Sequence, residues 1–240
     1  MRKLGVTRTS YRRDHALLAP DSFVRAPLPG MREATAVVHA APASGAAFTQ
    51  YTAEFEAAGM LGPAAGQRFV FVIEGAVRVE IGGQRRRLKK DGYAYLPAGA
   101  DHRVVADKPA RAAVIEKPYR PLPGIEPPRA VFGAERAVAG QPLMGDPALE
   151  VRTLLPENPA FDMAVNTMTF EPGASLPMVE CHVMEHGLFM LDGGGVYRLG
   201  ERWYPVAAGD FIWMAPFCPQ WFGALGKTPS RYLIYKDWNR

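Results

Sequence analysis

The stretch Val72-Ile73-Glu74-Gly75-Ala76-Val77 has a counterpart later in the chain, Met190-Leu191-Asp192-Gly193-Gly194-Gly195, and this pair decides the fold. A second pair follows at a similar interval: Lys90-Asp91-Gly92-Tyr93-Ala94-Tyr95-Leu96-Pro97 resembles Ala208-Gly209-Asp210-Phe211-Ile212-Trp213-Met214-Ala215-Pro216. Each copy is typical of a strand, a glycine turn and a second strand. A unit that occurs twice predicts two similar domains rather than one large domain.

The rest of the chain favours an all-β fold. Runs rich in β-branched and aromatic residues alternate with turns supplied by the 24 glycines and 22 prolines. Such runs span residues 68–73, 76–81, 195–199, 210–214 and 231–235. Gly82-Gly83 directly follows one of them and predicts a hairpin. Many short strands with regular turns predict a sandwich or a small barrel.

A proline-rich stretch separates the two copies. It runs from Pro118 to Pro128 and is typical of a semi-rigid linker. At 240 residues the chain has room for two domains of ordinary size. We therefore expect an N-terminal domain over residues 1–120, a linker over 121–135 and a C-terminal domain over 136–240.

The composition is that of a globular protein without a nucleic-acid or membrane partner. Hydrophobic residues make up 48% of the chain and charged residues 22%, which allows a sizeable core. The net charge of +4 is small, and its one basic run, Arg85 to Lys90, is best explained as a solvated turn or edge strand. No apolar run reaches the roughly 18 residues of a membrane span, and no signal-like apolar stretch follows the basic segment Met1 to Arg13. With only two cysteines, Cys181 and Cys218, we expect a reduced, cytoplasmic location.

The second copy resembles the metal-binding motifs of the cupin superfamily. These motifs contain the pattern His-x-His-x-x-x-Glu, a glycine after it, and a third histidine later in the chain. Glu180, His182 and His186 stand at the first three positions here, and Gln220 stands at the position of the third histidine. The resemblance implies an all-β fold of two tandem cupin barrels, which are double-stranded β-helices of the jelly-roll type.

The first copy retains only part of these motifs. The turn Pro97-x-Gly99-x-x-His102 is present, but Gly62, Ala64 and Arg68 stand at the other three positions. We therefore expect the N-terminal cupin to be metal-free and to serve as a structural partner of the second.

The expected ligands of the second copy would share one face of an extended segment. In a strand, residues of the same parity point the same way, so Glu180, His182 and His186 would point together into the barrel. By the same parity Glu185 would face solvent, and Cys181 is expected to be an inert buried thiol. A carboxylate, two imidazoles and an amide suit Mn²⁺, Fe²⁺ or Co²⁺ better than an ion that prefers thiolates.

The ligand pattern is a weak signal when taken alone, because histidines at this spacing are often ordinary surface or core residues. The repeat strengthens it, since three of the five histidines in the chain fall in the two motifs. His15 and His39 lie outside both motifs and are expected to be ordinary. Cys218 has no assigned role.

The whole chain resembles one family more narrowly. Leu17-Leu18-Ala19-Pro20-Asp21, Glu180-Cys181-His182-Val183-Met184-Glu185-His186-Gly187 and Tyr235-Lys236-Asp237-Trp238-Asn239-Arg240 are similar to segments of the (S)-ureidoglycine aminohydrolases. That family consists of bicupins from the allantoin-degradation branch of purine catabolism. The resemblance implies Mn²⁺ bound by the four ligands named above. Gln220 discriminates best, because most metal cupins keep histidine there.

The resemblance also implies a reaction and the residues that carry it. (S)-Ureidoglycine and water would give (S)-ureidoglycolate and ammonia, so the enzyme would be a hydrolase that breaks a C–N bond. Tyr197, Tyr232 and Lys236 match positions that contact the substrate in the family. Because the reaction needs proton transfer, we expect Glu180 to act as a base and Lys236 to bind the substrate or move a proton.

Two other functions fit the same residues. One is a different metal-dependent cupin enzyme, a dioxygenase or an isomerase, although an amide ligand is unusual in iron oxygenases. The other is a non-enzymatic bicupin that binds a sugar or senses an effector, although no helix-turn-helix pattern is visible outside the two copies. The expected partner is a small ureide substrate. Because exposed sheet edges favour symmetric pairing, we also expect a homo-oligomer of unknown order.

Overall fold

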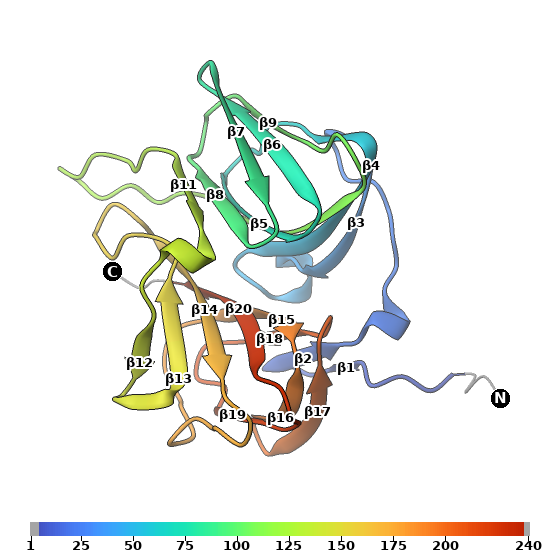
Figure 1. The fold of residues 1–240 in the computed structure, drawn as a ribbon, viewed down its shortest axis with the longest axis vertical. Helices are drawn as coiled ribbons and strands as arrows, with labels where there is room; N and C mark the ends of the chain where they lie inside the picture. Colours follow the sequence, from blue (N-terminus) through green and yellow to red (C-terminus); the bar gives the residue numbers. More distant parts are fainter. Residues whose placement is uncertain (1–4, 238–240) are drawn as a thin grey trace. The chain divides into compact units, whose positions relative to one another are not determined.

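A computed structural model describes residues 5–237 and confirms the all-β fold of two cupin barrels (Figure 1). Met1 to Leu4 and Trp238 to Arg240, the ends of the basic N-terminus and of the C-terminal stretch compared above, lie outside the described residues. The chain divides into two compact units. Among the described residues, the first barrel comprises residues 24–139 and 152–165, and the second comprises residues 5–23, 140–151 and 166–237.

The first barrel is built on a single sheet with the strand order β11-β8-β5-β10-β4-β9-β6-β7, with β3 paired to β4. Its strands are β3 (Met31–Ala40), β4 (Thr49–Leu61), β5 (Gln67–Glu74), β6 (Ala76–Ile81), β7 (Gln84–Lys89), β8 (Gly92–Leu96), β9 (His102–Val105), β10 (Ala110–Lys117) and β11 (Val131–Ala134). Two short 3-10 turns, η2 (Pro42–Ser44) and η3 (Glu135–Ala137), complete it.

The second barrel has one sheet in the order β1-β2-β18-β15-β20-β14-β13-β12 and a smaller sheet in the order β17-β16-β19. Its strands are β1 (Ser10–Tyr11), β2 (His15–Leu18), β12 (Gln141–Leu143), β13 (Asp146–Thr153), β14 (Met163–Phe170), β15 (His186–Asp192), β16 (Gly194–Leu199), β17 (Arg202–Ala207), β18 (Phe211–Met214), β19 (Gln220–Ala224) and β20 (Ser230–Asp237). The 3-10 turn η1 (Pro20–Ser22) follows β2, and β13 and β14 cross the division between the two units.

The two copies of the sequence repeat form equivalent backbone hydrogen bonds in the two barrels. The amide of Asp91 donates to the carbonyl of Val72, and the amide of Gly209 donates to that of Met190, both at 2.8 Å. Each residue of the first pair lies 118 positions before its counterpart. The same interval before the four expected ligands leads to Gly62, Ala64, Arg68 and His102, which are the residues that the sequence comparison also aligned with them.

The turns of the repeat need a left-handed backbone. Gly75 and Gly193 have φ angles of 74° and 68°, which glycine adopts without a steric penalty. Gly209 has a φ of 91°, and its counterpart in the first barrel is Asp91, with a φ of 63°. The turn residue there is therefore Asp91 rather than the neighbouring Gly92.

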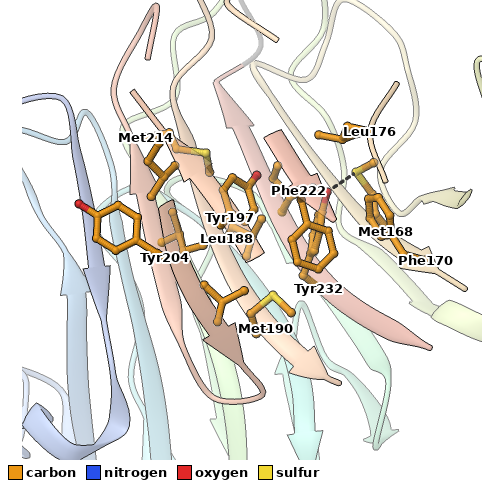
Figure 2. Packing of buried hydrophobic residues seen from close by; sticks show 14 of the residues in the cluster. Met168, Phe170, Leu176, Leu188, Met190, Tyr197, Tyr204, Met214, Phe222 and Tyr232 are labelled. Carbon is orange, nitrogen blue, oxygen red and sulfur yellow. Dashed lines mark hydrogen bonds between the residues drawn. The ribbon is translucent and has the colours of Figure 1, made fainter. Parts of the chain in front are cut away.

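Each barrel has its own hydrophobic core, and aromatic rings fill much of the second (Figure 2). The ring centroid of Phe222 lies 5.5 Å from that of Tyr197 and 5.7 Å from that of Tyr232. Phe170 packs edge-on against Phe222 at 4.9 Å. This packing immobilises two tyrosines that the sequence assigns to substrate contact.

The N-terminal segment belongs to the second barrel, which differs from the expected domain over residues 1–120. Strand β2 pairs with β18, with Leu17 opposite Ile212. Pairing satisfies backbone groups that an open edge of β18 would leave exposed. The end of the expected linker, residues 121–135, also differs, because β11 pairs with β8 of the first barrel. Both differences arise from strand pairing between segments that lie outside the repeated stretches, and the local repeat does not encode such pairing.

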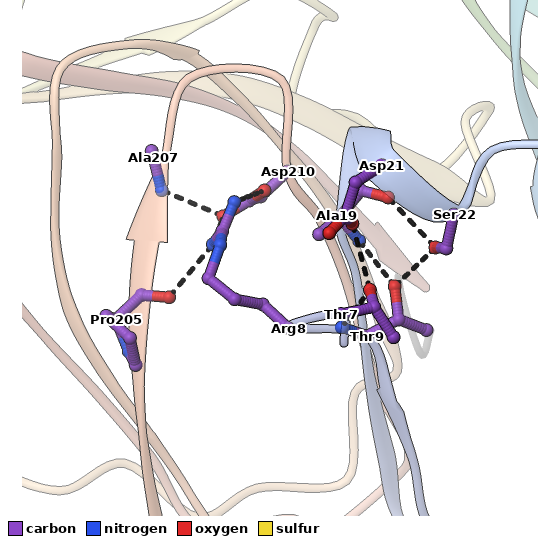
Figure 3. Close-up of polar contacts among 9 residues, drawn as sticks. All are labelled: Thr7, Arg8, Thr9, Ala19, Asp21, Ser22, Pro205, Ala207 and Asp210. Carbon is purple, nitrogen blue, oxygen red and sulfur yellow. Dashed lines mark hydrogen bonds and ion pairs between the residues drawn. The ribbon is translucent and has the colours of Figure 1, made fainter. Parts of the chain in front are cut away.

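An ion pair fastens this segment to the second barrel (Figure 3). Arg8 donates hydrogen bonds to both carboxylate oxygens of Asp210, whose side chain is fully buried. The same guanidinium donates to the carbonyl of Pro205 at 3.1 Å. The hydrogen bonds to Asp210 raise the pKa of Arg8, so the guanidinium stays charged at any ordinary pH.

Replacing this arginine is expected to loosen the segment. Arg8→Met leaves the buried Asp210 carboxylate without its cation and should lower the free energy of unfolding by about 1 to 2 kcal/mol. The expected loss in the free energy of unfolding is no larger because the Arg8 side chain is 41% exposed and its charge is partly screened by solvent. Denaturant titration measures the change, and Arg13→Met, an exposed arginine of the same segment, is the control. Equal midpoints for the two variants would contradict the role assigned to the pair.

The basic run lies on β7, an edge strand of the first barrel whose arginines are exposed. It forms the predicted hairpin with β6, in which Ile81 pairs with Gln84 across Gly82-Gly83. The explanation as a solvated edge strand is therefore confirmed. In residues 5–237, no helix is long and apolar enough to cross a membrane.

His39 couples the stability of the first barrel to pH. Its ring is buried, bonds the Thr52 hydroxyl at 2.8 Å, and has its pKa lowered to about 3, first by burial and then by Arg111. Unfolding exposes the ring and restores a pKa near 6.5, so the unfolded chain takes up a proton between these values. The contribution of neutral His39 is therefore complete above about pH 6.5 and declines as the pH falls toward 3.

From pH 7 to pH 5, wild-type protein should lose about 2 kcal/mol more of its free energy of unfolding than His39→Gln does. The glutamine keeps a hydrogen-bonding group but cannot titrate. Urea unfolding of both proteins at the two pH values measures the difference. Identical losses would show that His39 does not titrate between these pH values on unfolding.

Candidate functional site

A cavity of about 120 Å³ in the second barrel is lined by every residue that was assigned to the site from the sequence. Its lining includes polar and apolar side chains. The polar residues, called the polar wall, are Glu180, His182, His186, Tyr197, Gln220, Tyr232 and Lys236, and the apolar residues, called the apolar wall, are Leu143, Met168, Leu176, Met184 and Ile234. Ligand positions separated by up to 40 residues along the chain thus meet at one place.

The four expected ligands reach the cavity from two facing segments. Glu180 and Gln220 form an isolated antiparallel bridge, with reciprocal backbone hydrogen bonds of 2.8 and 2.9 Å. His186 opens β15, and the Nε2 atoms of His186 and His182 are 3.3 Å apart. The Nε2 atom of Gln220 lies 3.1 Å from Nε2 of His182. Two imidazoles and one amide therefore converge directly, beside the backbone of Glu180.

The segment that carries these ligands is not the continuous strand expected from residue parity. Between the bridge at Glu180 and the start of β15 the chain is irregular. As a result Glu185 is buried rather than solvent-facing, and its carboxylate accepts a hydrogen bond of 2.7 Å from the indole of Trp213. Cys181 is exposed rather than buried. The turn rotates these side chains away from the directions that a strand would give them.

The contacts of the two ring nitrogens of His186 fix the tautomer that a metal ligand would need. Its Nδ1 lies 3.2 Å from the carbonyl of Tyr235, which can only accept, so Nδ1 carries the proton and the Nε2 lone pair faces His182. Burial, followed by His182 and Lys236, lowers the pKa of His186 to about 3. The ring is therefore neutral at neutral pH, which metal binding requires.

The residues present fit a divalent cation. Because Nε2 of His186 is an acceptor, Nε2 of His182 must be the donor in their contact, and Nδ1 of His182 is then a buried atom without a hydrogen-bond partner in the described structure. A cation between the two Nε2 atoms would bind both lone pairs once the proton of His182 has moved to Nδ1. The Gln220 amide supplies an oxygen in one of its two orientations, which differ only by exchange of Oε1 and Nε2.

The three expected substrate contacts surround this group. Strand register places Lys236 opposite His186, and Lys236 lines the cavity. Tyr197 donates to Oε1 of Gln220 at 3.3 Å, and the Tyr232 hydroxyl donates to the sulfur of Met168 at 3.2 Å (Figure 2). Burial is the main cause that raises the pKa of both phenols, and the Glu180 carboxylate adds to it. Both hydroxyls therefore remain protonated and can donate.

The apolar wall was not identified from the sequence. Leu143, Met168 and Leu176 come from β12, β14 and the loop that follows it, none of which belongs to the motifs. Their only sequence signal is ordinary β-type patterning, which does not distinguish a cavity wall from a core.

The equivalent place in the first barrel is filled by an arginine side chain. Nη1 of Arg68 lies 2.9 Å from Nε2 of His102 and donates to the carbonyl of Gly62 at 2.6 Å. Its Nε donates to Glu116 at 2.8 Å, and strand register pairs these two residues as it pairs His186 with Lys236. A fixed cation at this position repels a metal ion, which supports the expectation of a metal-free first cupin.

Comparisons with known proteins agree with a chain of two cupin barrels. The Cupin domain family matches residues 63–116 and 166–235, one stretch in each barrel. The (S)-ureidoglycine aminohydrolase of Arabidopsis thaliana is 43% identical over 98% of this chain and 80% of its own length. The enzyme of the same name from Escherichia coli is 31% identical over 94% of this chain and 88% of its own length.

A solved structure shows the same architecture. The E. coli protein Ylba superposes with a TM-score of 0.87 at 29% identity, covering 98% of this chain and 95% of that one. Sequence similarity of this extent over both barrels indicates common descent with the aminohydrolases. The chain therefore belongs to the (S)-ureidoglycine aminohydrolase family of bicupin enzymes.

Proposed function

We propose that this protein converts (S)-ureidoglycine and water to (S)-ureidoglycolate and ammonia, as a step in allantoin breakdown. Glu180, His182, His186 and Gln220 would hold one Mn²⁺ ion, although Fe²⁺ and Co²⁺ suit the same donors. The observation that carries the proposal is the convergence of His182, His186 and Gln220 within 3.3 Å, in a cavity that Lys236 also lines. Relatives of that name supply the substrate.

The shape of the cavity suits a small polar substrate. Its volume of about 120 Å³ is well below the roughly 300–1,000 Å³ of pockets for drug-sized ligands. Ureidoglycine carries a carboxylate, a ureido group and an amine on one carbon, so its polar groups match the polar wall. The apolar lining residues Leu143, Leu176 and Ile234 have side chains that offer no hydrogen bonds, and they exclude water from their part of the cavity.

The reaction breaks the bond between the central carbon and the amine and forms a bond from that carbon to the oxygen of water. A bound divalent cation would supply Lewis-acid polarisation and orientation of the substrate. One proton of water must reach the departing amine, which leaves as ammonia. In this proposal Glu180 accepts that proton. Either Glu180 passes it to the amine while Lys236 binds the substrate carboxylate, or Lys236 gives its own proton to the amine and regains one from Glu180. Tyr197 and Tyr232 donate hydrogen bonds that fix one enantiomer.

The proposal is tested by following ureidoglycine with NMR. The substrate is generated from allantoate by its amidohydrolase and separated from that enzyme by rapid filtration. Mn²⁺-loaded protein should accelerate ammonia release and form only the (S) product, and protein stripped of metal should not. Decay at the spontaneous rate with metal-loaded protein would refute the activity and leave the fold and the metal ligands unaffected.

A cytoplasmic location and an oligomeric assembly are also part of the proposal. Both cysteines are free, which agrees with the cytoplasmic location expected from the composition. No nucleic-acid or membrane partner is proposed. We also propose assembly into a homo-oligomer, which light scattering would measure.

A further inference from the structure

A second group of metal-ligating side chains lies in the second barrel, outside the site described above. Asp14 and His15 stand at the start of β2, and Cys218 stands in the turn between β18 and β19. One carboxylate oxygen, one imidazole nitrogen and the thiol sulfur all lie within 4.8 Å of one another. The sequence motifs assigned no function to any of the three.

Backbone hydrogen bonds hold the two contributing segments together. The amide of Ala215 donates to the carbonyl of Asp14 at 2.9 Å, and the amide of Cys218 donates to that of Ala215 at 3.1 Å. His15 is also paired with Met214 in the β2–β18 ladder. The three side chains are therefore brought together by fixed elements rather than by mobile loops.

The hydrogen bonds of His15 match those of a metal ligand. Its Nδ1 lies 2.9 Å from Oδ1 of Asp14, and its Nε2 lies 2.9 Å from the hydroxyl of Tyr204. A ligating histidine typically uses its second nitrogen to bond such a partner, which fixes the ring. In Figure 2 the Tyr204 hydroxyl points away from the other labelled core residues. Nδ1 is then the nitrogen that faces Asp14 and is free to exchange its proton for a cation.

The thiol distinguishes this group from an ordinary buried histidine with an acidic partner. The thiol of Cys218 donates a long hydrogen bond of 3.7 Å to the carbonyl of Pro219, and the sulfur is also hydrogen-bonded to the backbone of Gly200. Because 3.7 Å is long, the thiol gains little from donating its proton to Pro219. His15 and Cys218 are buried, whereas the Asp14 side chain is 52% exposed and leaves one side open to solvent.

We propose that Asp14, His15 and Cys218 form a second divalent-cation site, of the class that binds zinc. Sulfur, nitrogen and oxygen donors suit Zn²⁺ or Co²⁺, and water from the open side completes the coordination. The thiol loses its proton to solvent as the sulfur binds the ion. The ion links residues about 200 positions apart and clips strand β2 onto the β18–β19 turn. This site is independent of the proposed reaction.

Cobalt binding tests the proposal, because only a thiolate ligand gives an intense near-ultraviolet sulfur-to-cobalt absorption band. Metal-free full-length protein titrated with Co²⁺ should develop this band to a plateau of one thiolate-bound ion per chain. Cys218→Ser should abolish the band, and Cys181→Ser, which changes the only other cysteine, should retain it. Absence of the band at saturating Co²⁺, or its loss in Cys181→Ser instead, would overturn the proposal.

Two further variants guard against a folding defect in Cys218→Ser. Asp14→Asn and His15→Gln keep the thiol but each removes one ligand, so the band should persist at saturation while the Co²⁺ affinity falls about 10-fold or more. Circular dichroism confirms that each variant is folded. Unchanged affinity in both variants would exclude the proposed ligand set.

Discussion

His186→Ala is expected to remove both metal binding and ammonia release. The ring of His186 is buried, and its surroundings fix its neutral form and its tautomer. The substitution leaves His182 and Gln220 without the donor that faces them, so Mn²⁺ affinity should fall at least about 100-fold. Turnover should fall about 1,000-fold or more, because the reaction then loses its Lewis acid. Equilibrium binding of Mn²⁺ and NMR of the product measure the two effects.

The control for this variant is His102→Asn in the first barrel. His102 stands at the position equivalent to Gln220 but contacts Arg68 rather than a metal site. Its loss should leave Mn²⁺ binding and turnover within about twofold of the wild type, after the folded fraction is measured by circular dichroism. Retention of tight Mn²⁺ binding by His186→Ala would place the metal elsewhere.

Lys236→Met is expected to reduce turnover while sparing the metal. Lys236 pairs with His186 in the strand register and lines the cavity in which the substrate is proposed to bind. Removing a group that binds the substrate charge or transfers a proton should lower kcat/KM by about 100- to 10,000-fold. Methionine has a similar length and no charge. Mn²⁺ affinity should stay the same or rise slightly, because a positive charge beside the ligands is lost.

Lys227→Met is the matched control, because Lys227 is exposed on a loop of the same barrel. It should have wild-type turnover. If Lys236→Met also retained wild-type turnover, the catalytic and substrate-binding roles of Lys236 would both be excluded. A loss of Mn²⁺ binding in Lys236→Met would instead indicate a structural role beside the ligands.

The fold was predictable because its signal is local and occurs twice. The stretches around Gly75 and Gly193 encode a strand, a left-handed turn and a second strand, and both turns adopt positive φ. The attachment of β2 to β18 was not predictable, since it depends on pairing between residues almost 200 positions apart. No pattern near Leu17 distinguishes a strand of the first barrel from one of the second.

The candidate site was predictable to the extent that its residues fall in motifs. The spacing of Glu180, His182 and His186 identified residues that do converge with Gln220. The directions of the side chains next to these residues were not predictable, because the parity argument assumed a strand where the chain is irregular. Glu185, expected in solvent, is buried against Trp213 for that reason.

The most direct test of the central claim is to titrate metal-free protein with Mn²⁺ and to measure bound Mn²⁺ and (S)-ureidoglycolate formation on the same samples. The account predicts that turnover rises in proportion to bound ion and reaches its plateau at one Mn²⁺ per chain, with no rise in His186→Ala. Full turnover in metal-free protein, or one tightly bound Mn²⁺ per chain without any turnover of ureidoglycine, would contradict it.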